Sequence, residues 1–299
     1  MKIEKVLIIY KKSAYQTYFR EYKPPHFTKL ARAGDKVLAH IKRSHKVHYS
    51  SLEFVQTVLK KHGIRYDHLH RGRLFNENGY DLVISLGGDG TFLDAARNVR
   101  EKFILGVNSD TNHSVGKFCH AYKGNFEKVL SLIRRRQFKV RKINRMEIAV
   151  NDKKFPKPIL NDVLICHACP AAMSHYTLEI QGRRETQRGS GLWVSTAVGS
   201  TGATKSAGGK ILPLGSARFQ YLPRELYRGH GVHHRLKGGF VPKDLNFFVY
   251  SLMQEGIIYM DGAHHNLSFR YGDKISFSKA KYPLNMVYFG SGDFATDLR

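Results

Sequence analysis

The stretch Asp81-Leu-Val-Ile-Ser-Leu-Gly-Gly-Asp-Gly-Thr-Phe-Leu-Asp-Ala-Ala-Arg-Asn-Val99 decides the fold of the first half of the chain. Its first six residues form an apolar run that fits a buried strand, and the residues from Thr91 onward have helix spacing. The glycines between them allow positive φ and let a ligand approach the backbone closely. The segment therefore predicts a strand, a tight turn and a helix whose free N–H groups suit a phosphate.

Asp89 distinguishes this turn from a simple phosphate cradle, because a carboxylate repels phosphate. Its presence is explained if it binds Mg²⁺ or takes a proton from an attacking hydroxyl. The Gly-Lys-Ser/Thr ending of a Walker A loop is missing. A plain turn with an Asp cap is the alternative interpretation of a bare Gly-Asp-Gly. We predict that Asp89 takes one of these two catalytic roles and that a phosphate group binds the backbone around it, at Gly87, Gly88, Gly90 and Thr91.

Short apolar runs and helix-spaced stretches alternate on both sides of this segment, as far as about residue 140. The other strand candidates are residues 5–10 and 103–107, and the other helix candidates are residues 51–62 and 125–135. Such alternation is typical of a parallel sheet covered on both faces. We therefore predict a Rossmann-like α/β domain.

From about Lys139 the pattern changes to short runs rich in β-branched and aromatic residues, separated by glycine and proline. This pattern is typical of an all-β domain. The predicted organisation is an α/β domain over residues 1–140, an all-β domain over residues 141–280, and a final strand or tail over residues 281–299 that returns to the first domain.

The charge balance of the 299 residues is unusual, since 49 Lys and Arg face 24 Asp and Glu, a formal net charge of +25. Such a chain attracts polyanions, either nucleic acid or nucleotide phosphates. Three cysteines do not make a disulfide framework. No stretch approaches the ~18 apolar residues of a membrane span, and the apolar run near the start is too short for a signal-peptide core. We expect a cytoplasmic protein.

A second glycine-rich segment, residues 189–209, is dense in small and hydroxyl side chains. We interpret it as a strand, a tight loop and a short helix. Small side chains leave room for a flat ligand against the backbone, and the hydroxyls of Thr201 and Ser206 can bond its polar edges. This segment is a candidate nucleotide pocket.

The Gly-Gly-Asp-Gly-Thr motif resembles one shared by NAD kinases, diacylglycerol and sphingosine kinases and, with Ser for Thr, phosphofructokinases. Residues 189–209 resemble the NAD kinase pattern, residues 160–165 resemble that family's Asn-Glu segment, and residues 260–262 resemble its late Asp-Gly turn. The four motifs stand in family order over roughly residues 80–290. The resemblance is closest to the plant-type NADH kinase branch, where it extends to Gly106–Asp110 and to Cys169-Pro-Ala171.

This resemblance implies a kinase that transfers the γ-phosphoryl group of ATP to the adenosine-ribose 2′-hydroxyl of NAD⁺ or NADH, giving NADP⁺ or NADPH. It implies Mg²⁺ or another divalent cation with the donor, and a homodimer or homotetramer. The residues expected to bind the dinucleotide are Asn161, Asp162, Arg188, Ser190, Thr201, Gly202, Ala203, Ser206 and Asp261. Arg188 has the alternative interpretation of a solvated loop residue.

Three positions depart from the commonest family pattern. Ser190 stands where Asp is usual, in a position that contacts the nicotinamide end in the family. Gly202-Ala203 replaces Ala-Tyr, and Asp162 replaces Glu. Losing an anionic contact near the ring weakens any preference for the cationic, oxidised cofactor, and this favours NADH.

Two other functions remain open at this point. A lipid or sphingoid kinase shares the glycine motif, although residues 161–162 and 199–209 speak against it. A basic nucleic-acid-binding protein with a decayed kinase site would use the Arg134–Arg136 cluster, which we interpret as a solvated helix end. Zinc binding at Cys166-His-Ala-Cys169 lacks a second ligand pair. We expect small-molecule nucleotides as partners, and neither nucleic acid nor a membrane.

Overall fold

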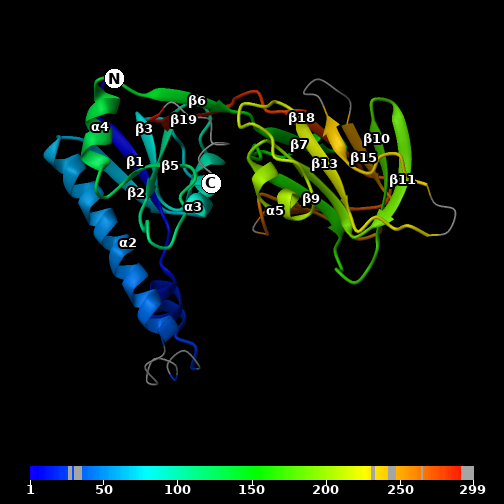
Figure 1. Ribbon diagram of the computed structural model, residues 1–299, viewed down its shortest axis with the longest axis horizontal. Coiled ribbons are helices and arrows are strands. Elements are labelled where there is room, and N and C mark those ends of the chain that lie inside the picture. Colours follow the sequence, from blue (N-terminus) through cyan, green and yellow to red (C-terminus); the bar gives the residue numbers. More distant parts are fainter. Residues whose placement is uncertain (26–28, 30–35, 230–232, 242–246, 264, 291–299) are drawn as a thin grey trace. The chain divides into compact units, whose positions relative to one another are not determined.

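The computed structural model describes residues 1–25, 29, 36–229, 233–241, 247–263 and 265–290. Residues 291–299 of the tail expected over 281–299 lie outside this part. The chain divides into two compact units, of which one comprises residues 1–141 and 284–290 and the other residues 142–283. The two units are coloured in chain order in Figure 1.

The first unit is built on a seven-stranded sheet (Figure 1). Its order is β2-β1-β3-β4-β19-β6, and β5 also pairs with β4. β1 is parallel to β2 and β3, and β4 is parallel to β3, β5 and β19. The strands are β1 (Lys5–Tyr10), β2 (Arg65–His70), β3 (Leu82–Gly87), β4 (Phe103–Asn108), β5 (Cys119–Tyr122), β6 (Lys139–Ile143) and β19 (Leu284–Tyr288).

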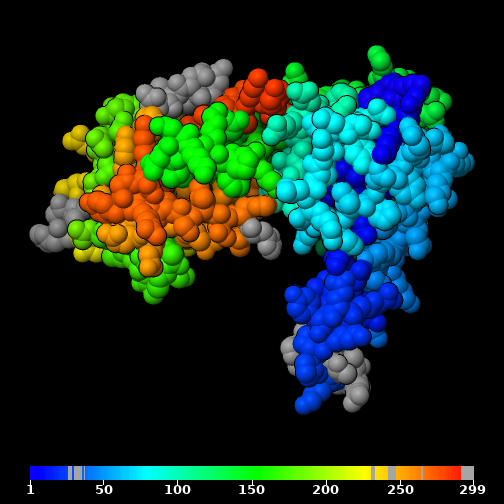
Figure 2. All heavy atoms as spheres, turned by 180° about the vertical axis from the view of Figure 1, so that it is seen from behind, coloured from blue at the N-terminus to red at the C-terminus, as the bar shows by residue number. Residues whose placement is uncertain are grey.

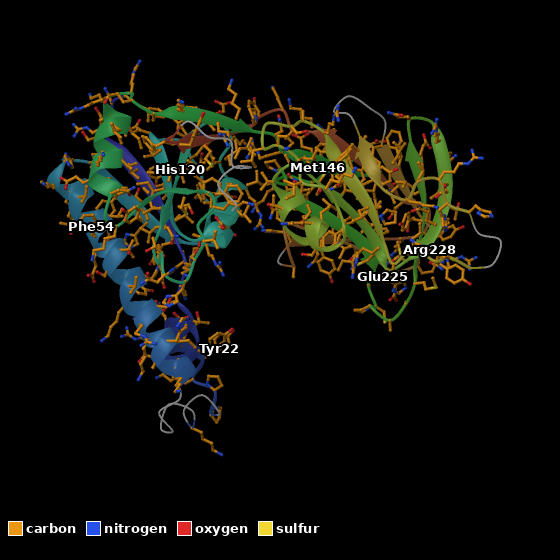
Figure 3. The ribbon with its side chains drawn as sticks, in the orientation of Figure 1. Tyr22, Phe54, His120, Met146, Glu225 and Arg228 are labelled. Carbon is orange, nitrogen blue, oxygen red and sulfur yellow. The ribbon has the colours of Figure 1, made fainter. Side chains whose placement is uncertain are left out.

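The α-helices of the first unit bury apolar side chains, whereas its π-helix has no buried residue. The helices are η1, a π-helix (Gln16–Tyr22), α2 (Lys36–Lys61), α3 (Asp89–Ala96) and α4 (Phe126–Arg134). α4 buries Phe126, Val129, Leu130 and Ile133, which recur at helix spacing. The first half of α2 and η1 together form an arm that projects from the sheet (Figures 1 and 2). Tyr22, 78% exposed, lies on this arm (Figure 3).

The second unit contains two six-stranded antiparallel sheets that share one apolar core. The sheet orders are β11-β10-β15-β18-β7-β8 and β14-β13-β12-β9-β16-β17. Burial alternates strictly along β10, as expected for a strand with one face in a core. The strands are β7 (Met146–Val150), β8 (Lys153–Lys154), β9 (Asp162–His167), β10 (Ser174–Ile180), β11 (Arg183–Gly189), β12 (Gly191–Ser195), β13 (Phe219–Arg224), β14 (Gly239–Val241), β15 (Phe247–Ser251), β16 (Gly256–Met260), β17 (His265–Phe269) and β18 (Lys274–Lys279).

Two short helical segments follow β12, namely the 3₁₀ turn η2 (Gly199–Thr201) and α5 (Ala203–Ser206). They confirm the strand, loop and short helix expected there. The predicted fold class, a parallel α/β sheet followed by antiparallel β-structure, is also confirmed. The helix expected over 51–62 is the second half of the longer α2. None of the described helices is both long and apolar enough to cross a membrane.

Candidate active site

The glycine-rich turn lies at the carboxyl end of β3. Gly87 ends the strand, Gly88 is the N-cap residue of α3, and Asp89 is the first residue of that helix. A Cβ on Gly87 would lie 2.3 Å from Thr91 Oγ1, and a Cβ on Gly88 would lie 2.2 Å from Ser114 Oγ. A side chain at either position would therefore require the neighbouring hydroxyl side chain to move.

Asp89 is half-buried, and its carboxylate accepts a hydrogen bond of 2.9 Å from the backbone N–H of Phe118. The nearby thiol of Cys119 is 4.0 Å from the carbonyl of Gly87. Burial, and then the charge of Asp89, raises the pKa of Cys119 to about 12. Cys119 is therefore a neutral thiol near neutral pH and cannot accept a proton or act as a nucleophile. Asp89 is the candidate proton acceptor of this turn.

Two cations that the sequence did not single out lie at the carboxyl ends of neighbouring strands. Lys11 follows β1 and Arg71 follows β2, with the Arg71 N–H bonded to the Tyr10 carbonyl at 2.8 Å. A Cβ on Gly90 would lie 3.7 Å from an Nη atom of Arg71. Burial lowers the pKa of Lys11, opposed by the charge of Asp110. Ligands of open α/β sheets bind at this edge, so both side chains are candidate phosphate ligands.

In the second unit, Asn161, Asp162 and Asp261 come together where β9 begins and β16 ends. The carboxylate of Asp261 accepts the backbone N–H of Leu160 at 3.1 Å and that of Asn161 at 2.6 Å. The Asp261 N–H donates to the Asp162 carbonyl at 2.9 Å. Asp261 has φ 50°, in the left-handed region. Asp261 therefore shapes the loop that presents the other two residues.

Asp162 is 7% exposed and sits opposite Ser195 of β12 in the sheet register. Burial, and then the negative charge of Asp261, raises the pKa of Asp162 to about 7. The hydroxyls of Ser195 and Thr204 are buried and have no hydrogen-bond partner within the described residues. Buried polar groups are usually paired, so these hydroxyls and Asp162 suit a polar ligand.

The loop from β12 to α5 lies against this cluster. A Cβ on Gly199 would lie 2.2 Å from the Asn161 carbonyl oxygen, so the loop backbone touches the start of β9. The hydroxyl of Thr201 donates to the carbonyl of Val198 at 3.1 Å. The remaining predicted residues of this loop are exposed, namely Gly202, Ala203 and Ser206. The structure thus places seven predicted residues on or beside one loop, namely Asn161, Asp162, Asp261, Thr201, Gly202, Ala203 and Ser206.

Arg188 and Ser190 lie at the other end of β12. Arg188 is an exposed residue of β11, and the Ser190 N–H donates to the Arg224 carbonyl at 2.9 Å. From Gly191 to Ser195 a strand covers about 13 Å. These two predicted residues are therefore separated from the Asp162 cluster by the length of the strand.

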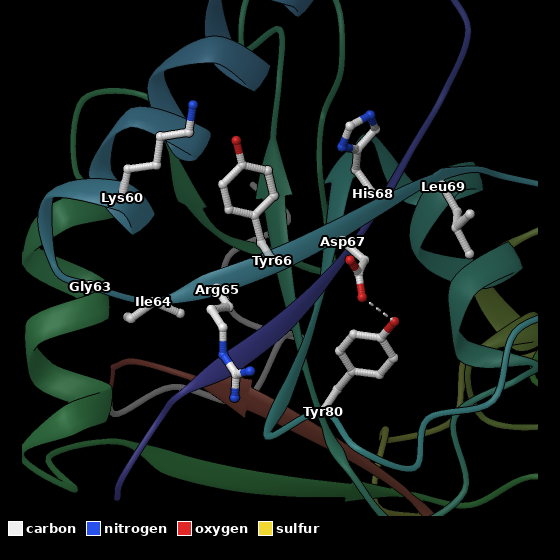
Figure 4. Close-up of a pocket in the computed structure, with 9 residues that line it drawn as sticks. All are labelled: Lys60, Gly63, Ile64, Arg65, Tyr66, Asp67, His68, Leu69 and Tyr80. Atoms are coloured by element: carbon white, nitrogen blue, oxygen red, sulfur yellow. Dashed lines mark hydrogen bonds between the residues drawn. The ribbon is translucent and has the colours of Figure 1, made fainter.

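No cluster of three or more metal-ligating side chains occurs among the described residues. Mg²⁺ usually needs only one or two carboxylates when substrate phosphates supply the other ligands, and Asp89 beside the glycine turn would fit that role as the alternative to the role of proton acceptor. A hollow of about 900 Å³ along β2 lies elsewhere (Figure 4). There Tyr80 donates a hydrogen bond of 2.7 Å to Asp67, and none of the predicted site residues lines it.

Comparisons with known proteins agree on one family. The model of the ATP-NAD kinase N-terminal domain matches residues 8–138. A probable NADH kinase of Oryza sativa subsp. japonica is 30% identical over 291 residues, 88% of this chain and 90% of the relative. The NADH kinase of Arabidopsis thaliana is 31% identical over 287 residues, 84% of this chain and 86% of the relative.

The fold is also similar to a solved structure. An NAD kinase from Archaeoglobus fulgidus, crystallised in complex with ATP, superposes with a TM-score of 0.69 at 22% identity. The match covers 98% of this chain and 96% of that chain. At 22% identity this likeness shows a similar fold only, and the match includes residues of both units.

Proposed function

The chain belongs to the ATP-NAD kinase family, and we propose from this that it transfers the γ-phosphoryl group of ATP to the adenosine-ribose 2′-hydroxyl of NAD⁺ or NADH. The products are NADP⁺ or NADPH, and ADP. The single observation that carries the chemistry is Asp89, a half-buried carboxylate in a glycine turn at the start of α3.

Asp89 is the proposed general base. It orients the ribose hydroxyl and accepts its proton, while the Phe118 N–H holds one carboxylate oxygen in place. In phosphoryl transfer the transition state is loose, so proton transfer comes late and a weak base suffices. Positioning therefore matters more for Asp89 than basicity.

The phosphates of the donor ATP are proposed to bind at the glycine turn and the cations beside it. The backbone of Gly87, Gly88 and Gly90 and the start of α3 offer N–H groups and a positive dipole end. Lys11 and Arg71 add positive charge at the same edge of the sheet. Mg²⁺ bound with the triphosphate would supply further charge neutralisation.

The dinucleotide is proposed to bind at the residues of the second unit around Asp162. Asn161 and Asp162 are proposed to contact the adenine and ribose, with Thr201, Gly202, Ala203 and Ser206 lining the pocket and Asp261 supporting it. Arg188 and Ser190, at the far end of β12, are proposed to contact the nicotinamide end. An uncharged Ser190 at that end favours NADH, which lacks the positive charge of NAD⁺. Both plant relatives are named NADH kinases.

Oligomeric state and compartment complete the proposal. A homodimer or homotetramer is proposed from the family resemblance. All three cysteines are free thiols, and this supports a reducing compartment such as the cytoplasm.

The test is direct. Purified protein is incubated with ATP and Mg²⁺ and offered NAD⁺ and NADH in parallel, and NADP⁺ and NADPH are quantified. Asp89→Ala should lower kcat by ~10²–10⁴ because it removes the base. Product from the wild type but not from the variant supports the reaction and the role of Asp89, and the ratio of the two rates gives the preferred oxidation state. Properly folded wild-type protein that yields neither product contradicts the proposal.

A further inference from the structure

One face of α2 carries polar side chains where an apolar stripe would be expected. They recur with a spacing of three or four residues and so share one face of the helix. All of them contact the segment 109–113, which follows β4. These side chains are His40, Ser44, His48 and Ser51.

The central contact of this face is Asp110, which is 2% exposed. Ser44 donates a hydrogen bond of 2.8 Å to one carboxylate oxygen, and the His113 ring nitrogen lies 3.0 Å from both oxygens. Burial alone would raise the pKa of Asp110, but Ser44, His113 and the charge of Lys11 hold it below its usual value. Asp110 is therefore a buried, ionised carboxylate that is paired with Ser44 and His113. A buried charge destabilises a fold when it loses its partners, so the structure around Asp110 must keep these contacts.

Contacts within the segment connect Asp110 to the catalytic turn. The Asp110 N–H donates to Asn108 Oδ1 at 3.1 Å, and the Asp110 carbonyl accepts the Ser114 N–H at 3.0 Å. Asn108 Nδ2 in turn donates to the Ser114 carbonyl at 2.9 Å. Ser114 packs directly on Gly88.

The same segment ends on the catalytic carboxylate, because the Phe118 N–H donates to Asp89 Oδ1 at 2.9 Å. Contacts therefore run from α2 through Asp110 and Asn108 to Ser114 and Gly116. The Cys119 N–H then closes a turn onto the Gly116 carbonyl at 2.8 Å, and this turn contains the Phe118 amide that donates to Asp89.

We propose that Asp110 is a positioning residue for the phosphoryl-transfer step: by anchoring the segment 109–118 to α2, it fixes the Phe118 amide and thereby the orientation of Asp89. The inference rests on the proposed role of Asp89. In this role Asp110 acts through the backbone of residues 109–118 and not by contact with substrate. Errors in position of about 1 Å can cost ~10²-fold in rate, so loosening this segment has a large kinetic effect.

Asp110→Asn is the main variant, because it keeps the shape and removes the charge. Asp67→Asn is the control, since Asp67 is a carboxylate of the first unit that accepts a hydrogen bond from the Tyr80 hydroxyl (Figure 4) and pairs with Lys5. We expect Asp110→Asn to lower kcat about 10- to 100-fold with KM for NADH within about twofold. Asp67→Asn should leave both constants unchanged. An equal loss in both variants, or a change in KM alone, overturns the proposal.

A double-variant cycle separates positioning from general damage. Added to Asp89→Ala, Asp110→Asn should cause no further loss of residual activity, because Asp110 acts through Asp89. A full additional loss of the same factor overturns the proposal. If Asp110→Asn does not fold, Ser44→Ala removes one donor only and should lower kcat a few-fold, with the same absence of effect in the Asp89→Ala background.

Amide hydrogen exchange gives a readout independent of activity. Exchange of the Phe118 amide should be faster in Asp110→Asn than in the wild type and unchanged in Asp67→Asn. Unchanged exchange in Asp110→Asn overturns the positioning role, even in an active enzyme. If the Phe118 amide exchanges faster in Asp110→Asn than in the wild type, but the wild type makes no NADP(H), then the contacts are as described and the proposed function is wrong.

Discussion

Asp162 and Asp261 show how two neighbouring carboxyl groups acquire different properties from their surroundings. Asp261 accepts hydrogen bonds from two backbone N–H groups. Asp162 is buried beside it, and burial with the charge of Asp261 raises its pKa to about 7. Near neutral pH Asp162 therefore has a protonated fraction that can donate a hydrogen bond.

Replacing Asp162 should change how stability depends on pH. The folded-state pKa is raised above the unfolded value near 4, so the protonated form favours folding. The contribution of Asp162 is fully present below about pH 4 and is lost as pH rises through 7. We expect Asp162→Asn, relative to the wild type, to gain roughly 1–4 kcal/mol in the free energy of unfolding between pH 4 and pH 8. Urea unfolding at several pH values measures this difference, and parallel curves for the two proteins would contradict it.

At the scale of elements, the proposed dinucleotide pocket depends on close packing between a strand and a loop. The Thr196 N–H donates to the Asn161 carbonyl at 2.9 Å, where the loop leaves β12 beside the start of β9. Gly199 then touches the same carbonyl, so no side chain fits at this position. The glycines of this segment therefore serve a close approach of two backbones.

Gly199→Ala should disturb this approach. The added Cβ would lie 2.2 Å from a backbone oxygen, and overpacking of this kind costs about 1–3 kcal/mol. We expect a lower Tm and weaker NADH binding, measured by thermal unfolding and by NADH fluorescence. Gly215→Ala is the control, since a Cβ there meets nothing within 4 Å. Equal effects of the two variants would show that the close approach does not matter.

At the scale of the whole molecule, the net charge of +25 is the dominant property. ATP, NADH and NADP(H) are all anions, and a strongly cationic protein raises their local concentration through its field. The field is screened by salt, with a Debye length of about 10 Å at 0.1 M. Part of the surplus lies in the arm of the first unit, where α2 carries no acidic residue in its first turn.

Salt should therefore slow substrate capture more than chemistry. We expect kcat/KM for ATP and for NADH to fall several-fold between about 20 and 200 mM KCl, while kcat at saturation changes little. Initial rates over a salt series, with the Mg²⁺ concentration fixed, measure both constants. A kcat/KM that is insensitive to salt would mean that the surplus charge has no part in substrate capture.

The sequence alone determined the two kinds of architecture and the glycine turn with Asp89, because these depend on local patterns of apolar residues and glycine. It missed β2 and the first half of α2, since β2 is a polar edge strand and that half of α2 packs through His40, Ser44 and His48. Periodicity detects apolar packing only.

Only the tertiary structure decided which distant residues act together. Lys11, Arg71 and Asp110 lie at the same edge of the sheet as the glycine turn because parallel strands end there. Asp162 meets Ser195 through the register of β9 and β12. The raised pKa of Asp162 and the anchoring of Asp89 both follow from such long-range pairing. Neither property can be predicted from a short stretch of sequence, because burial and the proximity of charges depend on residues far apart along the chain.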